Sequence, residues 1–110
     1  MAKTRMAPEL VALVAVRFRA LAEPARLEIM QTLRGGECTV GELADATGLG
    51  VANVSKHLQS LHGAGFVTRR KEGLHVYYAL AGDDVFALCD IICGRLASEV
   101  KTRGRIVASR

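Results

Sequence analysis

The fold of this chain is decided by residues 39–61, which read TVGELADATGLGVANVSKHLQSL. Thr39 and Glu42 stand three residues apart, the spacing at which each side chain accepts a hydrogen bond from the other residue's backbone N–H at the start of a helix. The pattern predicts a short helix that runs to about Thr47. We expect Gly48 to end it, because glycine adopts the left-handed conformation of a helix C-terminus at low cost.

A second, longer helix is predicted from about Val51 to Ala64. Its apolar residues recur at helical spacing on one side and are Val54, Leu58 and Leu61. A helix-turn-helix needs a small residue where its helices cross, a left-handed residue in the turn and a wedge between the helices. Ala44, Gly48 and Val54 stand at those positions. The stretch therefore predicts a helix-turn-helix.

After this helix the pattern changes from a period of about 3.6 to a period of about 2. Residues 66–71 and 75–80 are predicted as two strands, and Gly73 supplies the positive φ of the tight turn between them. A β-hairpin directly after the second helix makes the unit a winged helix-turn-helix. The predicted fold class is therefore α+β, mainly α, with about five helices and a two-stranded hairpin as the wing.

The other helices are predicted on both sides of this unit. Pro8 and Pro24 each suit the first turn of a helix, and we expect one helix to about residue 22 and another that Gly35 stops. Asp83 or Asp84 caps a last helix. The first and last helices carry apolar residues on more than one face. We therefore expect a homodimer formed through these two helices.

The composition is that of one globular domain, with 110 residues of which 50% are apolar and 24% charged. The expected division is an N-terminal arm over 1–7, the domain over 8–97 and a basic, disordered tail over 98–110. Three cysteines without Cys-x-x-Cys spacing favour a reducing cytoplasm. No apolar run approaches the ~20 residues that cross a bilayer, so no membrane association is expected. Neither a phosphate-binding glycine loop nor a Cys–His pair with an orienting carboxylate is evident, so the chain is not expected to be an enzyme.

Positive charge falls in one middle stretch, residues 50–82, and at the two ends, residues 1–5 and 95–110, with acidic stretches between them. The chain carries a net charge of +4, and residues 50–82 alone contribute four cations and one acid, a net +3. This balance favours an anionic partner. The solvent side of the second helix is short and polar, so it could enter a DNA major groove, with Lys56 on phosphate or guanine and an amide on adenine. The candidate DNA contacts are Asn53, Ser55, Lys56, Gln59 and Ser60 in the helix and Arg69, Arg70 and Lys71 in the hairpin. Successive residues of a strand alternate faces, so these three hairpin cations cannot all point at one surface.

Five segments carry a family likeness and read LAEPARLEIM (21–30), VGELA (40–44), VSKHLQSL (54–61), AGFV (64–67) and RRKEGLHVYYAL (69–80). With these segments the chain resembles the ArsR/SmtB winged-helix repressors over roughly residues 15–97. The resemblance implies a homodimer on an imperfectly palindromic double-stranded operator, released by an inducer, with positions 53, 55, 56 and 59 at the DNA. The chain departs from many members at 50–52, where GVA replaces hydroxyl or amide side chains, which implies fewer phosphate contacts there.

Inducer sites of the family are clusters of thiols or imidazoles. One common site needs a Cys-x-Cys pair near residues 39–47, and here Val40 stands where the thiol after Cys38 would be. Another is a zinc site on the last helix, which the absence of any histidine after His75 excludes. Neither of these two family sites is therefore expected.

Cys89 and Cys93 are four residues apart and so lie on one face of the last helix. They could bind a soft metal or metalloid, such as cadmium or arsenite, with a third ligand from Cys38 or from the partner's pair, or undergo oxidation or persulfidation. Cysteines are also often simply buried, and no cofactor is required for the fold. Two alternatives to an inducible repressor with a cysteine sensor stay open. One is a metal-independent repressor with structural cysteines, and the other is a winged-helix module that binds protein.

Overall fold

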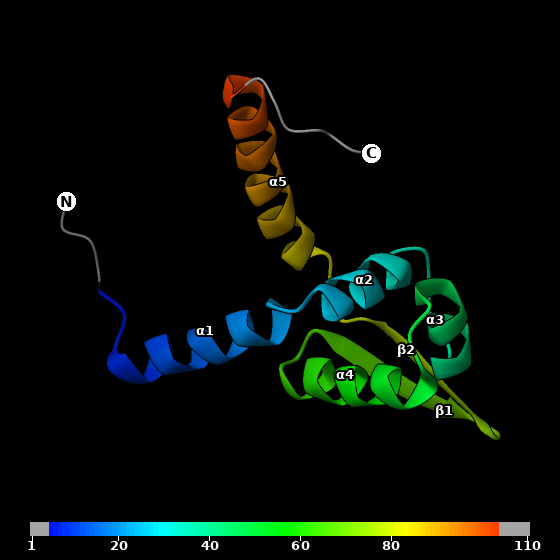
Figure 1. The fold of residues 1–110 in the computed structure, drawn as a ribbon. Coiled ribbons are helices and arrows are strands. Elements are labelled where there is room, and N and C mark those ends of the chain that lie inside the picture. Colours follow the sequence, from blue (N-terminus) through cyan, green and yellow to red (C-terminus); the bar gives the residue numbers. More distant parts are fainter. Residues whose placement is uncertain (1–4, 104–110) are drawn as a thin grey trace.

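The computed structural model describes residues 5–103, apart from the side chains of residues 102 and 103. The elements follow in the order α1 (Pro8–Leu21), α2 (Pro24–Leu33), α3 (Val40–Thr47), α4 (Val51–Gly63), β1 (Val67–Glu72), β2 (His75–Leu80) and α5 (Asp84–Arg103) (Figure 1). Over the described range, these five helices and one two-stranded antiparallel sheet confirm the predicted winged helix-turn-helix.

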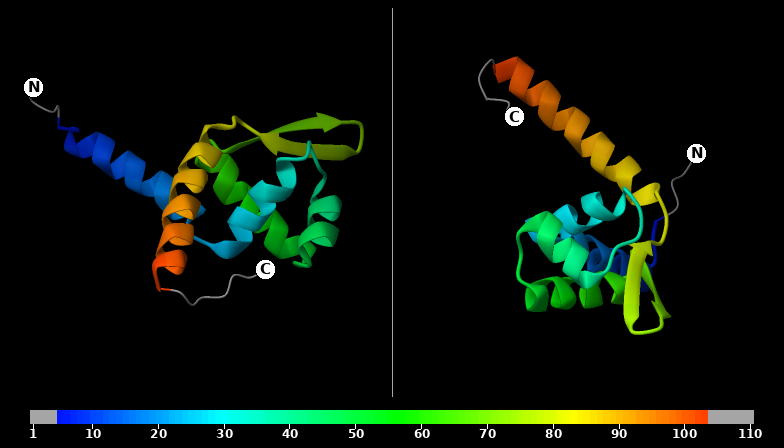
Figure 2. Two further views of the ribbon diagram at one scale, coloured as in Figure 1. Left: turned by 90° about the horizontal axis from the view of Figure 1, so that it is seen from above. Right: turned by 90° about the vertical axis from the view of Figure 1, so that its right-hand side faces the viewer.

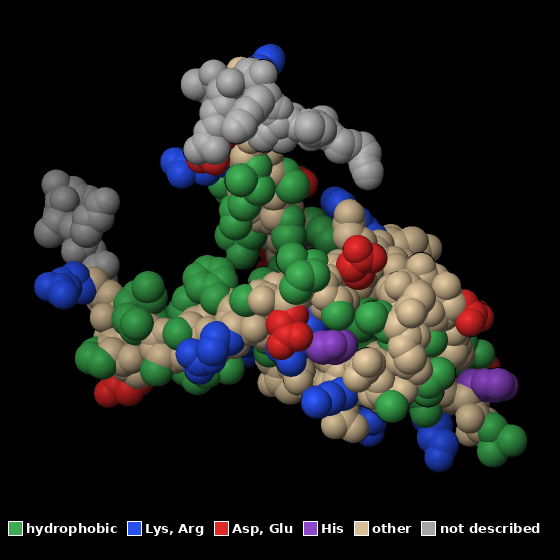
Figure 3. Space-filling view, viewed as in Figure 1, with side chains coloured by type: hydrophobic (Ala, Val, Ile, Leu, Met, Phe, Trp, Pro, Cys, Tyr) green, Lys and Arg blue, Asp and Glu red, His purple; other side chains and the backbone are tan. Residues whose placement is uncertain are grey.

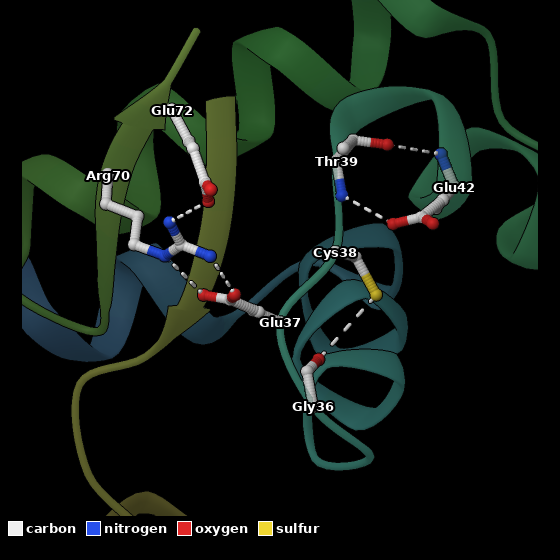
Figure 4. A network of polar contacts seen from close by, with 7 residues as sticks. All are labelled: Gly36, Glu37, Cys38, Thr39, Glu42, Arg70 and Glu72. Atoms are coloured by element: carbon white, nitrogen blue, oxygen red, sulfur yellow. Dashed lines mark hydrogen bonds and ion pairs between the residues drawn. The ribbon is translucent and has the colours of Figure 1, made fainter. Parts of the chain in front are cut away.

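The predicted turn between α3 and α4 is confirmed. Thr39 Oγ1 accepts a hydrogen bond from Glu42 N at 3.1 Å, and Glu42 Oε1 accepts one from Thr39 N at 2.9 Å (Figure 4). Gly48 follows α3 with a φ of 77°, a left-handed conformation that would strain any residue with a side chain. The chain can therefore leave α3 and enter α4 within a short turn.

The core lies between α2, α3, α4 and the base of the hairpin. The fully buried side chains of α3 and α4 are Leu43, Val54, Leu58 and Leu61. The helix α2 packs against them through Ile29, Met30 and Leu33. Since one side of α4 is completely buried, its opposite side must face solvent.

The hairpin pairs β1 with β2 from Val67 opposite Leu80 to Glu72 opposite His75. Gly73 in the turn has the positive φ expected of it, 62°. Val67 is buried at the base, whereas the turn is exposed. The hairpin therefore projects from the core as a wing (Figure 2).

Cys38, which precedes α3, pairs with β2 through an antiparallel bridge that the sequence did not predict. Cys38 N donates to Tyr78 O at 3.0 Å, and Tyr78 N donates to Cys38 O at 2.8 Å. The pairing joins the segment between α2 and α3 to the buried residue of β2. It anchors the base of the wing to the helices.

The helices α1 and α5 extend away from the core in different directions (Figures 1 and 2). The first turn of α5 is anchored by the buried Val85 and Phe86, and the Arg34 guanidinium lies 4.0 Å from the centre of the Phe86 ring. Large apolar side chains are exposed along both helices and are Leu10, Val11, Leu13, Val16 and Phe18 in α1 and Leu88, Ile91, Ile92 and Leu96 in α5. Figure 3 shows apolar atoms along both projections. The predicted surplus of apolar surface on these helices is confirmed.

The predicted tail over 98–110 is wrong in its first part, because α5 continues to Arg103. Residues 98–103 contain neither glycine nor proline, and Glu99 and Lys101 are good helix formers. The rest of that tail, and residues 1–4 of the predicted arm, lie outside the described residues. Across residues 5–103, no helix combines the length and the apolar character needed to span a membrane.

We expect Leu58→Ala to lower the free energy of unfolding by about 2 to 5 kcal/mol, because truncating a fully buried leucine leaves a cavity. Chemical denaturation of variant and wild type measures the difference. Leu74→Ala is the control, since Leu74 is 97% exposed in the hairpin turn and its loss should cost less than about 0.5 kcal/mol. Equal losses for the two variants would contradict this placement of the core.

Candidate nucleic-acid interface

The side of α4 opposite the core is exposed and polar. Asn53, Lys56 and Gln59 are exposed on it, and Ser55 is half-buried at its flank. In Figure 3, Lys and Arg side chains gather along the lower edge of the molecule, where α4 and the hairpin lie in Figure 1. Four of the five predicted contacts on this helix therefore lie on or beside one accessible surface.

The fifth predicted contact, Ser60, is half-buried, and its hydroxyl is hydrogen-bonded within the protein. Arg26 Nη2 donates to Ser60 Oγ at 3.2 Å, and Arg26 Nε donates to His57 Nδ1 at 3.1 Å. Arg26 Nη1 also donates to the backbone oxygen of Ala20, at 3.4 Å. One guanidinium thus joins the end of α1, the start of α2 and the helix α4, and the hydroxyl of Ser60 is already engaged.

Arg26 was not identified from the sequence, although a signal for it exists. Its spacing from Ile29, Met30 and Leu33 puts it on the inward side of α2. A cation on that side of a helix needs hydrogen-bond partners. Its two side-chain hydrogen-bond partners, His57 and Ser60, lie 31 and 34 residues away, beyond the reach of any local pattern.

The three hairpin cations lie on two faces, as strand alternation predicts. Arg69 and Lys71 share the face of the buried Val67 but lie further out along the strand, where both are exposed. Arg70 lies on the opposite face. The hairpin therefore has two cations on one side and one on the other.

Arg70 is bound by two carboxylates (Figure 4). Its Nε and Nη2 donate to Glu37 Oε2 at 3.1 Å and to Glu37 Oε1 at 2.5 Å, and its Nη1 donates to Glu72 Oε1 at 2.6 Å. The guanidinium also lies 4.7 Å from the centre of the Tyr77 ring. The hydrogen bond from Arg70 lowers the pKa of Glu37, and the bonds to Glu37 and Glu72 raise the pKa of Arg70. The positive charge of Arg70 is therefore balanced by two carboxylates of the same chain.

The three cysteines do not come together within one chain. Cys38 is half-buried at the base of the wing, where its Sγ lies 3.6 Å from the backbone oxygen of Gly36, and burial raises the pKa of its thiol. Cys89 is half-buried and Cys93 is exposed on α5. Among residues 5–103, no three His, Cys, Asp or Glu side chains group as metal ligands. A third ligand for the Cys89 and Cys93 pair would therefore have to come from outside residues 5–103 of the same chain.

Both thiols on α5 face an apolar groove of about 440 Å³. The residues that line it come from α1, α2, α5 and the link between the first two helices and are Phe18, Leu21, Ala22, Leu27, Leu88, Cys89, Ile92, Cys93 and Leu96. The groove adjoins the exposed apolar side chains of α1 and α5. The cysteine pair thus lies within the apolar surface that the chain leaves uncovered.

We expect Arg70→Gln to return the pKa of Glu37 toward its ordinary value, because it removes the main group that lowers it. An NMR pH titration of the carboxyl carbons measures this pKa. Since the folded pKa is depressed, the pair stabilises the fold above the ordinary carboxyl pKa, and this contribution is lost as the pH falls through the depressed value. Arg69→Gln, on the opposite face of β1, should leave the Glu37 pKa low. An unchanged Glu37 pKa in Arg70→Gln would rule out the ion pair.

Residues 23–69 match the family model described as bacterial regulatory protein, arsR family. The chain is 39% identical over 85 residues to the HTH-type transcriptional regulator Rv0324 of Mycobacterium tuberculosis, over 74% of this chain and 38% of that protein. It is 49% identical over 63 residues to the HTH-type transcriptional regulator CmtR of the same species, over 57% of this chain and 53% of CmtR. The chain thus spans about half, or less, of the length of these relatives.

A solved structure matches nearly the whole chain. The homodimeric winged helix-turn-helix DNA-binding domain Mb0332 from Mycobacterium bovis, a possible ArsR-family transcriptional regulator, superposes with a TM-score of 0.73 at 32% identity. The match covers 99% of this chain and 100% of that one. The shared sequence and the shared fold agree, and this chain belongs to the ArsR family of winged helix-turn-helix regulatory proteins.

Proposed function

We propose that the protein is a transcriptional repressor that binds a double-stranded DNA operator as a homodimer and leaves it when an inducer binds. The observation that carries this proposal is the exposed polar and basic face of α4, held opposite a fully buried stripe and followed directly by a cationic wing. Membership of the ArsR family supports it. A regulator of this kind acts in the cytoplasm, without catalysis.

The helix α4 suits the major groove of B-DNA, which is about 12 Å wide and admits an α-helix. Lys56 extends far enough to bind a phosphate or a guanine edge, whereas Asn53 and Gln59 end in amides that can pair with adenine through two hydrogen bonds. Arg69 and Lys71 would bind phosphates beside that groove. Base contacts from α4 would then supply sequence preference, and the hairpin would add affinity.

A second copy of the chain is the proposed occupant of the apolar surface on α1 and α5. Leu13 is 63% exposed and Ile91 61% exposed, which is unusual for large apolar side chains that stay in water. The homologous domain Mb0332, which aligns with almost the entire chain, is homodimeric. A two-fold dimer would present two copies of α4 to successive major grooves about 34 Å apart, which implies an imperfectly palindromic operator.

The proposed inducer site is the Cys89 and Cys93 pair on α5. Two thiols one helical turn apart can bind a soft ion such as cadmium or arsenite, with the third ligand from the partner subunit, or react with an oxidant or a persulfide. Because the pair lies beside the proposed dimer surface, such a change would alter the geometry of the dimer. A difference of about 1–3 kcal/mol between two geometries changes operator affinity about five- to 150-fold.

Selection of duplexes from a random pool, followed by titrations at several salt concentrations, tests DNA binding. We expect Lys56→Ala to weaken binding to every duplex and to reduce the slope of log affinity against log salt by about 0.9, the loss of one phosphate contact. Gln59→Ala should instead bind the selected and a scrambled duplex more equally. Lys101→Ala is the control, because it removes the same charge near the far end of α5. A wild-type protein without salt-dependent affinity for duplex DNA would favour a module that binds protein.

We expect replacement of Cys89 and Cys93 by serine to preserve the dimer and its DNA binding but to abolish release by the inducer. Fluorescence anisotropy with arsenite, cadmium or a persulfide donor measures release, and sedimentation velocity measures the dimer. Cys38→Ser is the control, since Cys38 lies outside the groove. Unaltered release from the double variant would exclude this pair as the sensor, and dissociation of the dimer without inducer would assign the two thiols to packing.

A further inference from the structure

The wing holds one of its own cations in a carboxylate network of Glu37, Arg70 and Glu72. We propose that Glu37 withholds Arg70 from DNA phosphates and so limits the affinity of the wing for DNA of any sequence. This inference rests on the proposed DNA-binding function. It assigns to Glu37, a residue outside the helix-turn-helix and the hairpin, control over the number of phosphate contacts.

The geometry directs the Arg70 guanidinium to Glu37. Glu37 precedes α3 and lies 33 residues from Arg70 in the sequence, so only the fold brings them together. Both oxygens of Glu37 accept hydrogen bonds from the guanidinium, an arrangement with strong directional preference. The Arg70 guanidinium lies over the Tyr77 ring. Its side chain extends to the carboxylate of Glu37 (Figure 4).

The network also changes the charge that the wing offers to DNA. Arg69, Arg70 and Lys71 contribute +3, and Glu37 and Glu72 contribute −2, which leaves +1. Glu72 lies on the same strand as Arg70 and would move with it toward a phosphate. Glu37, in contrast, is attached to the helical core and holds Arg70 back. It is therefore the carboxylate that limits Arg70.

Stability of the wing does not require this network. The side chains of Arg70 and Glu37 are 51% and 37% exposed, and ion pairs so exposed contribute little to folding. The base of the hairpin is held instead by the buried Tyr78 and its backbone hydrogen bonds to Cys38. Loss of the Glu37 charge should therefore release Arg70 and leave the wing in place.

The test compares Glu37→Gln with wild type on heparin and on duplex DNA over a series of salt concentrations. We expect the slope of log affinity against log salt to become steeper by up to about 0.9, as for one added phosphate contact. At low salt the Kd for duplex DNA should fall about three- to tenfold. Glu28→Gln is the matched control, because it removes the same charge from an exposed position on α2 outside the network.

A second comparison separates release of Arg70 from a general change in charge. In an Arg70→Gln background, Glu37→Gln should leave the slope unchanged, because no guanidinium remains to be released. Thermal unfolding followed by circular dichroism verifies that each variant folds. The proposal is overturned if Glu37→Gln alone gives the slope of Glu28→Gln or a shallower one, or if it steepens the slope equally without Arg70. Later elution of Glu37→Gln from heparin, combined with no binding of wild type to any duplex, would support the release of Arg70 and reject the proposed operator binding.

Discussion

The burial of one stripe of α4 is the constraint on which the rest of the molecule depends. Val54, Leu58 and Leu61 are fully removed from water against α2 and α3. Burial of such side chains is the dominant favourable contribution to folding. Rotation of α4 about its axis would expose this stripe to water and lose that contribution. The polar side of the same helix is consequently presented to solvent in one orientation. The surface that we propose for DNA is thus held in place by the core behind it.

Three arginines of this protein make contacts within the chain. The Arg26 guanidinium donates to residues of α1 and α4, Arg34 lies against Phe86, and Arg70 is balanced by carboxylates. A count of cations in the helix-turn-helix and the wing therefore overstates the charge available to a partner. Position relative to the core, rather than residue type, decides which of them could reach a phosphate.

The exposed apolar helices and the cysteines of α5 are both related to the proposed dimer. A chain of 110 residues builds one small core, and here that core leaves most of α1 and most of α5 uncovered. In our proposal a second copy covers this surface, and the thiols on α5 lie within reach of it. A reaction at these thiols would then act on dimer geometry rather than on α4 directly, which is how distant sites become energetically coupled.

The sequence by itself determined most features that depend on near neighbours along the chain, although it placed the end of α5 too early. The capping pair of Thr39 and Glu42, the left-handed Gly48 and the periodicity of the helices and strands are set by interactions within a few residues, so local patterns reveal them. Only the tertiary structure decided that Ser60 is engaged by Arg26 and that Glu37 binds Arg70. Those partners lie more than 30 residues apart, and they meet because the buried side of α4 and the pairing of the hairpin bring their elements together. Hydrogen bonds between such distant side chains follow from packing and leave no periodic signal in the sequence.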